Sequence, residues 1–197
     1  MKDTKEYIID EAHKLFLKHS YEAVSISDIS QAIGLTKGSL YHHFKNKEEL
    51  FKSVIDRTFL IHSVFGQFEV ENTSLKQLND KCVENFQSVM SQLFRADNEF
   101  DSINYLSLFV DSFRHYTGYR EEKFRIFDIE IERIKIVLKN AIEKKEIRND
   151  IDISIMSMNY ISAIVGIAGH FLHSNSVSLA VSRSEERRVG KECRSRW

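Results

Sequence analysis

The sequence predicts an all-α protein, and three observations support this fold class. The 197 residues include no proline, where average usage would supply roughly ten, and they include seven glycines. β-Sandwiches, barrels and disulfide scaffolds need many turns built from these two residue types, so the sequence argues against them. Apolar residues recur at helical spacing along most of the chain. The balance of 42% hydrophobic and 29% charged residues is that of a folded globular protein and argues against wholesale disorder.

The first two helices are predicted from the caps at their ends. Asp3 can form a capping box with Glu6, so a first helix should begin there. Ser25 and Asp28 repeat the pattern and open a short second helix, which Gly34 should end because glycine adopts positive φ at low cost. The residues expected to face inward are Ile8, Ala12, Leu15, Phe16 and His19 in the first helix and Ile29, Ala32 and Ile33 in the second.

The next two helices follow the same logic. Thr36 caps a third helix over residues 37–44. Asn46, with Glu49 three residues on, opens a fourth helix that the apolar spacing extends to about residue 68. The residues expected to face inward are Leu40 and Phe44 in the third helix and Leu50, Val54, Ile55, Phe59 and Phe65 in the fourth.

The rest of the chain predicts longer helices separated by polar breaks and by Gly118. Their inward positions include Leu78 and Cys82 in the first of them, and Phe124, Phe127, Ile131, Ile134, Leu138 and Ile142 in the third. The last helix contains a stretch, residues 153–172, without Asp, Glu, Lys or Arg that is long enough to cross a bilayer. Its serines, asparagine and histidine favour a buried helix instead. The four helices are expected at residues 73–94, 100–116, 119–146 and 151–174.

Cysteine usage predicts a reducing compartment. Cys82 and Cys193 cannot form a disulfide framework, and the start of the chain lacks the unbroken apolar run of a secretory signal. A cytoplasmic protein is therefore expected. Cys82 falls on an apolar helical stripe, which favours a small core residue over a reactive thiol.

Residues 183–197 do not continue the helical spacing of apolar residues that runs through the preceding chain. They contain the one tryptophan, and their six basic and three acidic residues leave 22 basic and 26 acidic residues in 1–182. One interpretation is a basic arm that contacts nucleic acid or an acidic surface. The string RSEERRVGKECRSRW also resembles the translated read-through of a sequencing-library adapter. On that interpretation it is a non-native tail that does not belong to the predicted fold, and the natural C-terminus is unknown.

The strongest functional signal lies in residues 25–44, which predict two short helices joined at Gly34. In a helix–turn–helix unit the first helix crosses the DNA backbone and the second enters the major groove. Residues 34–47 contain three lysines and no acid, and the second helix is rich in hydrogen-bond donors. Phosphate oxygens only accept, so such a surface suits DNA. Gly38 would let the helix backbone approach DNA closely, at a cost of about 1 kcal/mol in helix propensity.

The segment TKGSLYHHFKNKEEL at residues 36–50 resembles the signature of TetR-family transcriptional regulators, and VSISDI at 24–29 and AIGL at 32–35 match the rest of that family's N-terminal domain. The resemblance implies a homodimeric, ligand-responsive repressor that a small, largely apolar effector releases from its DNA operator. It implies a helix–turn–helix head at residues 1–47 and a helical ligand-binding and dimerisation domain at 48–182. Neither enzymatic activity nor a cofactor is expected.

The resemblance also implies roles for individual residues of the head. Base edges should be contacted by Lys37, Gly38 and Ser39, with Thr36 beside them. Ser25 and Ser27 begin the helix that crosses the backbone, where many members have Thr and Arg, so their contacts should be weaker. Phosphates should be contacted by Tyr41, His42, His43 and Lys47.

The second domain is rich in aromatic residues. A packed helical core would account for each of them, whereas the resemblance implies that some line an effector cavity. The candidates are Phe59, Phe86, Asn104, Tyr105, Phe109, Phe113, Tyr116, Phe127 and Asn159. Small residues in the helix at 151–174 permit close approach of a second helix and fit a twofold dimer interface: Ala163, Gly166, Ala168 and Gly169.

Metal binding and catalysis have weaker support. His42 and His43 are adjacent in a helix, so they point about 100° apart and cannot share one ion. His170 and His173 could face one ion, but no second pair of ligands is evident. Two alternative functions stay open: a helical adaptor whose head has lost DNA affinity, and a helical enzyme that uses histidines. The absence of any nucleophile–base spacing argues against the enzyme.

Overall fold

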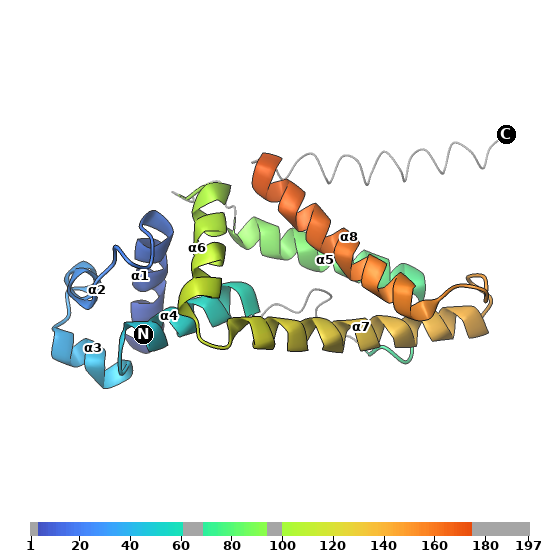
Figure 1. Ribbon diagram of the computed structural model, residues 1–197, viewed down its shortest axis with the longest axis horizontal. Helices are drawn as coiled ribbons and strands as arrows, with labels where there is room; N and C mark the ends of the chain where they lie inside the picture. The colour runs from blue at the N-terminus through green and yellow to red at the C-terminus, as the bar shows by residue number, and fades with distance from the viewer. Residues whose placement is uncertain (1–3, 61–68, 94–99, 175–197) are drawn as a thin grey trace.

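The computed structural model describes residues 4–60, 69–93 and 100–174, and this part of the chain is all-α, as predicted. The first three helices lie at one end of the molecule, α6 stands beside α1, and α7 runs lengthwise away from them (Figure 1). The helices are α1 (Thr4–Lys18), α2 (Ile26–Ile33), α3 (Lys37–His43), α4 (Lys47–Ile55), the π-helical turn η1 (Asp56–Leu60), α5 (Leu75–Leu93), α6 (Ser102–His115), α7 (Tyr119–Glu143) and α8 (Ile153–Ser174).

Helix caps set the boundaries of α2 to α4, as the sequence predicts. Ser25 and Asp28 form the capping box of α2, and Gly34 ends that helix with a φ of 68°. The Asn46 side chain accepts from the Glu49 backbone N–H at 2.8 Å and so caps α4. The Glu49 carboxylate accepts from the N–H of Lys45 at 2.7 Å, one residue before the expected partner.

The predicted helix from residue 47 to about 68 changes character at Ile55. The chain continues from α4 into η1, and the N–H of Asp56 bonds to the carbonyls of both Lys52 and Ser53. Single π-helical turns within helices frequently occur at functional sites. Residues 61–68, including the predicted anchor Phe65, and the predicted cap Asp3 lie outside the described residues.

Three residues predicted to face inward are exposed. α1 ends at Lys18, so its periodicity no longer governs His19, and Ala32 lies on the outer side of α2. Phe124 is 66% exposed, because the inner face of α7 passes through Lys123 and Glu130 instead. Glu130 is 2% exposed and accepts two 3.1 Å hydrogen bonds from Arg133.

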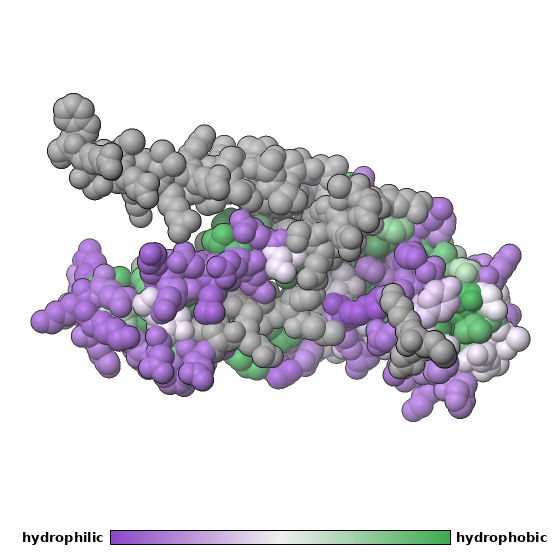
Figure 2. Space-filling view, turned by 180° about the vertical axis from the view of Figure 1, so that it is seen from behind, coloured by the Kyte–Doolittle hydropathy of each residue, from purple (hydrophilic) through white to green (hydrophobic). Residues whose placement is uncertain are grey.

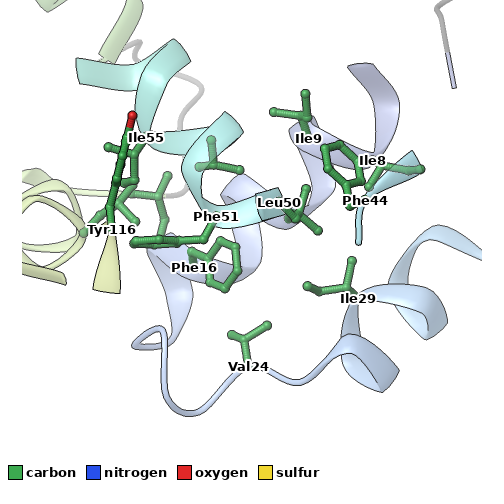
Figure 3. Close-up of a cluster of buried hydrophobic side chains, with 14 of the residues drawn as sticks. Ile8, Ile9, Phe16, Val24, Ile29, Phe44, Leu50, Phe51, Ile55 and Tyr116 are labelled. Atoms are coloured by element: carbon green, nitrogen blue, oxygen red, sulfur yellow. The ribbon is translucent and has the colours of Figure 1, made fainter. Parts of the chain in front are cut away.

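The first core joins α1–α4 to α6 and the start of α7 (Figure 3). Phe51 lies edge-on to Phe16 and to Tyr21, with ring centroids 5.1 and 4.6 Å apart. Because this core continues past residue 47, the division at that residue remains a prediction about roles and does not mark separate cores. Its buried residues are Ile8, Ile9, Ala12, Phe16, Leu17, Val24, Ile29, Ile33, Leu40, Phe44, Leu50, Phe51, Val54, Ile55, Tyr105, Leu108, Tyr116 and Tyr119.

The second core lies between α5, α7 and α8. Leu78 and Cys82 of α5 pack there, so Cys82 is the buried residue that the sequence predicts. Burial raises the pKa of the Cys82 thiol to about 11, which keeps it protonated and unreactive at neutral pH. From α7 and α8 the core takes Ile134, Val137, Leu138 and Ile161.

α8 differs from the buried helix that the sequence predicts. Ser157 and Ile161 face the second core, but several other apolar side chains of the helix are exposed: Ile155, Met156, Met158, Val165 and Ile167. Within the described parts of the chain, no helix is both long and apolar enough to cross a membrane. In the view from behind, hydrophilic residues cover much of the described surface, with smaller apolar areas between them (Figure 2).

We expect the stability of the first core to depend on pH through His13. The imidazole lies edge-on to Tyr105 at 6.1 Å, and burial, with Arg57 nearby, lowers its pKa to about 4. The unfolded chain takes up a proton near pH 6.5, so this contribution is complete above that pH and is lost as pH falls toward 4. Urea unfolding at pH 7.5 and 5 should show a loss of about 2 kcal/mol from this group.

The His13→Gln variant should lose that part of the pH dependence. His19→Gln is the matched control, since His19 is exposed just beyond the same helix. Parallel pH profiles for the wild type and His13→Gln would contradict the assignment.

Candidate nucleic-acid interface

Apolar side chains on the inner faces of α2 and α3 hold the helix–turn–helix unit together. Ile29 and Ile33 of α2 are buried, as are Leu40 in α3 and Phe44 at its C-cap. Ile29 and Phe44 point into the same cluster (Figure 3). Between the helices, the N–H of Gly34 bonds back to carbonyls of α2. The turn and the orientation of α3 are therefore set by the core.

The outward face of α3 carries most of the predicted DNA contacts. Burial of Leu40 and Phe44 fixes the rotation of the helix about its axis, so the remaining positions face away from the core. Tyr41 is 50% exposed, so its ring lies on the outward face of α3. Thr36, Lys37, Gly38, Tyr41 and His42 are exposed, and Ser39 and His43 are half-buried.

Gly38 has room for a side chain. A Cβ built there would meet Thr36 Oγ1 at 3.9 Å, an ordinary van der Waals contact. Packing inside the head therefore gives no reason for glycine in this helix. Close approach of an external surface to the α3 backbone would explain why this residue is a glycine.

Two predicted DNA contacts also cap helices. Thr36 Oγ1 accepts from the N–H of Ser39 at 3.2 Å, and Ser25 Oγ accepts from the N–H of Asp28 at 3.2 Å. The Thr36 hydroxyl keeps its own O–H as a donor. The Asp28 carboxylate accepts from the Ser25 N–H at 2.8 Å, and hydrogen bonding to Ser25 lowers its pKa. This negative charge makes Ser25 a poor place for a phosphate, although Ser25 and Ser27 are both exposed.

Lys47 points into the head. Its ammonium donates to the carbonyls of Tyr21 and Val24, both at 3.0 Å, and lies 4.0 Å from the centroid of the Tyr21 ring. Two of its three N–H groups are thus used internally. Among the three lysines of residues 34–47, Lys37 and Lys45 are exposed and supply the outward charge.

Tyr21 links the head to α6. Its N–H donates to the buried Asp111 carboxylate at 2.8 Å, and its ring stacks on His115 with centroids 4.4 Å apart. Asn104 Nδ2 donates to the carbonyl of Leu17 at 3.0 Å, so this candidate effector residue instead joins α6 to α1. The sequence reasoning missed Asp111; a carboxylate among the apolar inner positions of α6 was the available signal.

The structure brings together four of the predicted effector residues beside the π-helical turn. Phe109 lies 5.5 Å from Phe59 and 5.1 Å from Phe113, measured between ring centroids. Tyr119, which the sequence reasoning missed, lies 5.0 Å from Phe113 and 5.5 Å from Tyr116. These five residues are called the aromatic cluster below.

The other predicted effector residues lie elsewhere. Tyr105 is buried in the first core, and Phe127 packs against the second. Phe86 is half-buried on α5, and Asn159 is exposed on α8.

The described residues contain no group of three or more His, Cys, Asp or Glu side chains that could hold a metal ion. The rings of His42 and His43 lie 5.4 Å apart at 78°, which is an edge-on contact. The side chains of His170 and His173 lie outside the described residues.

Comparison with known proteins points to one family. Residues 8–54 match the family described as bacterial regulatory proteins, tetR family. The HTH-type transcriptional repressor ComR of Escherichia coli K12 is 45% identical over 53 residues, which are 27% of this chain and 25% of ComR. The regulator AcrR of Shigella flexneri is 35% identical over 69 residues, 35% of this chain and 31% of AcrR. The matched part of the chain thus spans a quarter to a third of these curated relatives.

Solved structures share the fold over most of the chain. MexZ, a repressor from Pseudomonas aeruginosa, is 19% identical with a TM-score of 0.65, over 98% of this chain and 94% of MexZ. A complex of SmeT with triclosan is 20% identical with a TM-score of 0.61, over 87% of this chain and 81% of SmeT. Residues 8–54 therefore form an N-terminal domain of the kind described as bacterial regulatory proteins, tetR family.

Proposed function

We propose that this chain is a transcriptional regulator, a repressor without enzymatic activity, that binds a DNA operator through α2 and α3. The observation that carries the proposal is the face of α3. Hydrogen-bond donors and the exposed Tyr41 lie opposite the buried Leu40 and Phe44, and residues 34–47 contain no acid. A rigid helix with this face is suited to the major groove of a polyanionic duplex.

The proposed contacts divide into two kinds. Base edges are contacted by Lys37, Gly38 and Ser39, with Thr36 beside them. Ser27 meets the backbone at the start of α2, while Ser25 is weakened by Asp28. Lys47 contributes chiefly inside the head. Phosphates are contacted by Tyr41, His42 and His43.

The proposed active form is a homodimer in which α8 pairs with its twofold mate. Several apolar side chains of α8 are exposed, and Ala163 and Gly166 lie exposed on the same helix, which permits close helix–helix approach. Two heads placed about 34–36 Å apart could then bind two half-sites one turn of DNA apart.

The Met158→Arg substitution should break this dimer without unfolding the chain. Met158 is 50% exposed in the single chain, so an arginine fits there, but pairing would bury its charge without a partner. Sedimentation velocity should show a monomer with unchanged helicity. Ser107→Arg is the control, at an exposed position on α6. A dimer of wild-type strength in Met158→Arg would place the interface elsewhere.

The proposed regulation is release from DNA by a small, largely apolar effector bound at the aromatic cluster. SmeT, which shares the fold, has been solved with triclosan. The aromatic cluster lies where η1, α6 and α7 meet, and α6 also contacts the head through Tyr21. An effector would weaken DNA binding if it bound better to a form of the dimer in which the distance between the two heads does not fit the operator. The loss of DNA affinity cannot exceed the difference in effector affinity between that form and the DNA-binding form.

Fluorescence anisotropy with the DNA upstream of the protein's own gene tests the proposal. Tyr41→Ala should weaken binding to all sequences by a similar factor, because it removes a phosphate contact. Lys37→Ala should cost about 1–3 kcal/mol on the preferred sequence and relax base preference. If the folded protein binds no oligonucleotide even in dilute salt, the adaptor function replaces this proposal.

A further inference from the structure

Two buried polar atoms beside the aromatic cluster have no hydrogen-bond partner among the described residues. They are Oδ1 of Asp56, in η1, and the hydroxyl of Tyr119, at the start of α7. Tyr119 is 1% exposed, so bulk water does not reach it. The hydroxyl of Ser112, which lies near the Tyr119 hydroxyl, donates to the carbonyl of Phe109 at 2.6 Å. Buried polar groups in native proteins are nearly always satisfied, so an unpartnered pair is a place where a water molecule or a polar group of a ligand can bind.

Lys123 lies one helical turn beyond Tyr119 on the same face of α7. Its ammonium donates to the carbonyl of Phe59 at 3.1 Å and lies 5.4 Å from the centroid of the Phe127 ring. Burial lowers the pKa of Lys123, and no described carboxylate offsets this effect. The side chain is half-buried, so one positive charge sits among aromatic rings with no ion pair to any carboxylate of the described residues.

Other cations border the same rings. Lys52 Nζ lies 5.0 Å from the centroid of the Tyr116 ring, and the Arg120 guanidinium lies 5.8 Å from that of Phe113. A cationic ligand could pair with the Asp56 carboxylate, but it would meet ring faces that already carry positive charge. A neutral ligand would leave the Lys123 ammonium without a counter-charge.

We infer that the effector of the regulator proposed above is an aromatic or largely apolar organic anion whose negative group binds the Lys123 ammonium. Its apolar part packs against Phe109 and Phe113, and a hydroxyl or N–H on the same molecule meets Oδ1 of Asp56 and the Tyr119 hydroxyl. Cβ atoms one helical turn apart are about 5–6 Å from each other, so a ligand the size of one or two rings can reach both Tyr119 and Lys123. The regulatory role of this ligand rests on the proposed function. Binding of the ligand itself can be measured without DNA.

Two fluorescent probes that differ in charge test the inference. 1-Anilinonaphthalene-8-sulfonate is an anion, and N-phenyl-1-naphthylamine is the same ring system without the sulfonate. The wild type should bind the sulfonate roughly tenfold more tightly than the neutral probe, as expected for a charge-assisted contact in a partly buried site. In Lys123→Met, affinity for the sulfonate should fall about tenfold and affinity for the neutral probe should not change.

Lys139→Met is the matched control, because Lys139 is exposed on the same helix. It should leave both affinities at wild-type values, and circular dichroism should show folded protein in each case. An unchanged ratio of the two affinities in Lys123→Met would overturn the inference. Operator binding measured on the same variants separates this failure from failure of the proposed function, since Lys123 lies outside the head.

Tyr119→Phe tests the unpartnered hydroxyl independently. Without ligand, its removal should leave the melting temperature equal to that of the wild type or higher, because no hydrogen bond is lost. A fall of several degrees would show that the hydroxyl is already satisfied in the free protein and would remove it from the site.

Discussion

Replacing Gly38 with alanine should leave the protein at least as stable as the wild type and still weaken operator binding about tenfold or more. Alanine favours a helix over glycine by about 1 kcal/mol, and the added Cβ meets Thr36 Oγ1 at an unstrained 3.9 Å. The free head therefore gains stability. In the complex the methyl group would lie between the α3 backbone and the base edges, and loss of one good base contact costs about 1–3 kcal/mol.

The measurement pairs urea unfolding with anisotropy on operator DNA at one salt concentration. Gly118→Ala is the contrasting variant, because Gly118 has a φ of 86°, which disfavours any side chain. It should lower stability by about 1 kcal/mol and leave α3 unchanged. If Gly38→Ala binds the operator as tightly as the wild type, α3 does not approach DNA at this residue.

Local features of the head could be predicted from the sequence because their partners lie three or four residues apart. The Ser25–Asp28 capping box, the Thr36 cap and the positive φ of Gly34 each involve one turn of chain. The inward positions Leu40 and Phe44 follow from helical periodicity in the same way. These features fix the orientation of α3, so the candidate DNA face could be predicted as well.

Contacts between distant segments could not be predicted in this way. Asp111 accepts from a backbone N–H that lies 90 residues earlier, and no local pattern encodes that pairing. Phe124 sits on an apolar repeat, yet it is exposed because Lys123 and Glu130 take inward positions on α7. The sequence predicts a buried helix at α8, whereas several of its apolar side chains are exposed in the single chain. In each case, packing against an element distant in sequence determines which side chains are buried, and the local spacing of residues does not.

Lys47 is the clearest example, and replacing it with methionine should destabilise the head by about 2 kcal/mol. Methionine keeps the aliphatic stem against Tyr21 but removes the charged donor to the carbonyls of Tyr21 and Val24 and the contact with the Tyr21 ring. Val24 is buried, so its carbonyl would have little access to water in compensation. Urea unfolding should show the loss. Lys45→Met is the matched control, because Lys45 is exposed two residues earlier and should not change stability.

DNA binding separates this internal role from the phosphate contact that the family resemblance implies. A lysine that neutralises one phosphate contributes about one unit to the slope of log affinity against log salt concentration. At a temperature where both proteins are folded, Lys47→Met should keep the wild-type slope, because the ammonium is held by two carbonyls of the head. A slope reduced by about one unit, with stability unchanged, would show instead that Lys47 turns outward to the DNA backbone.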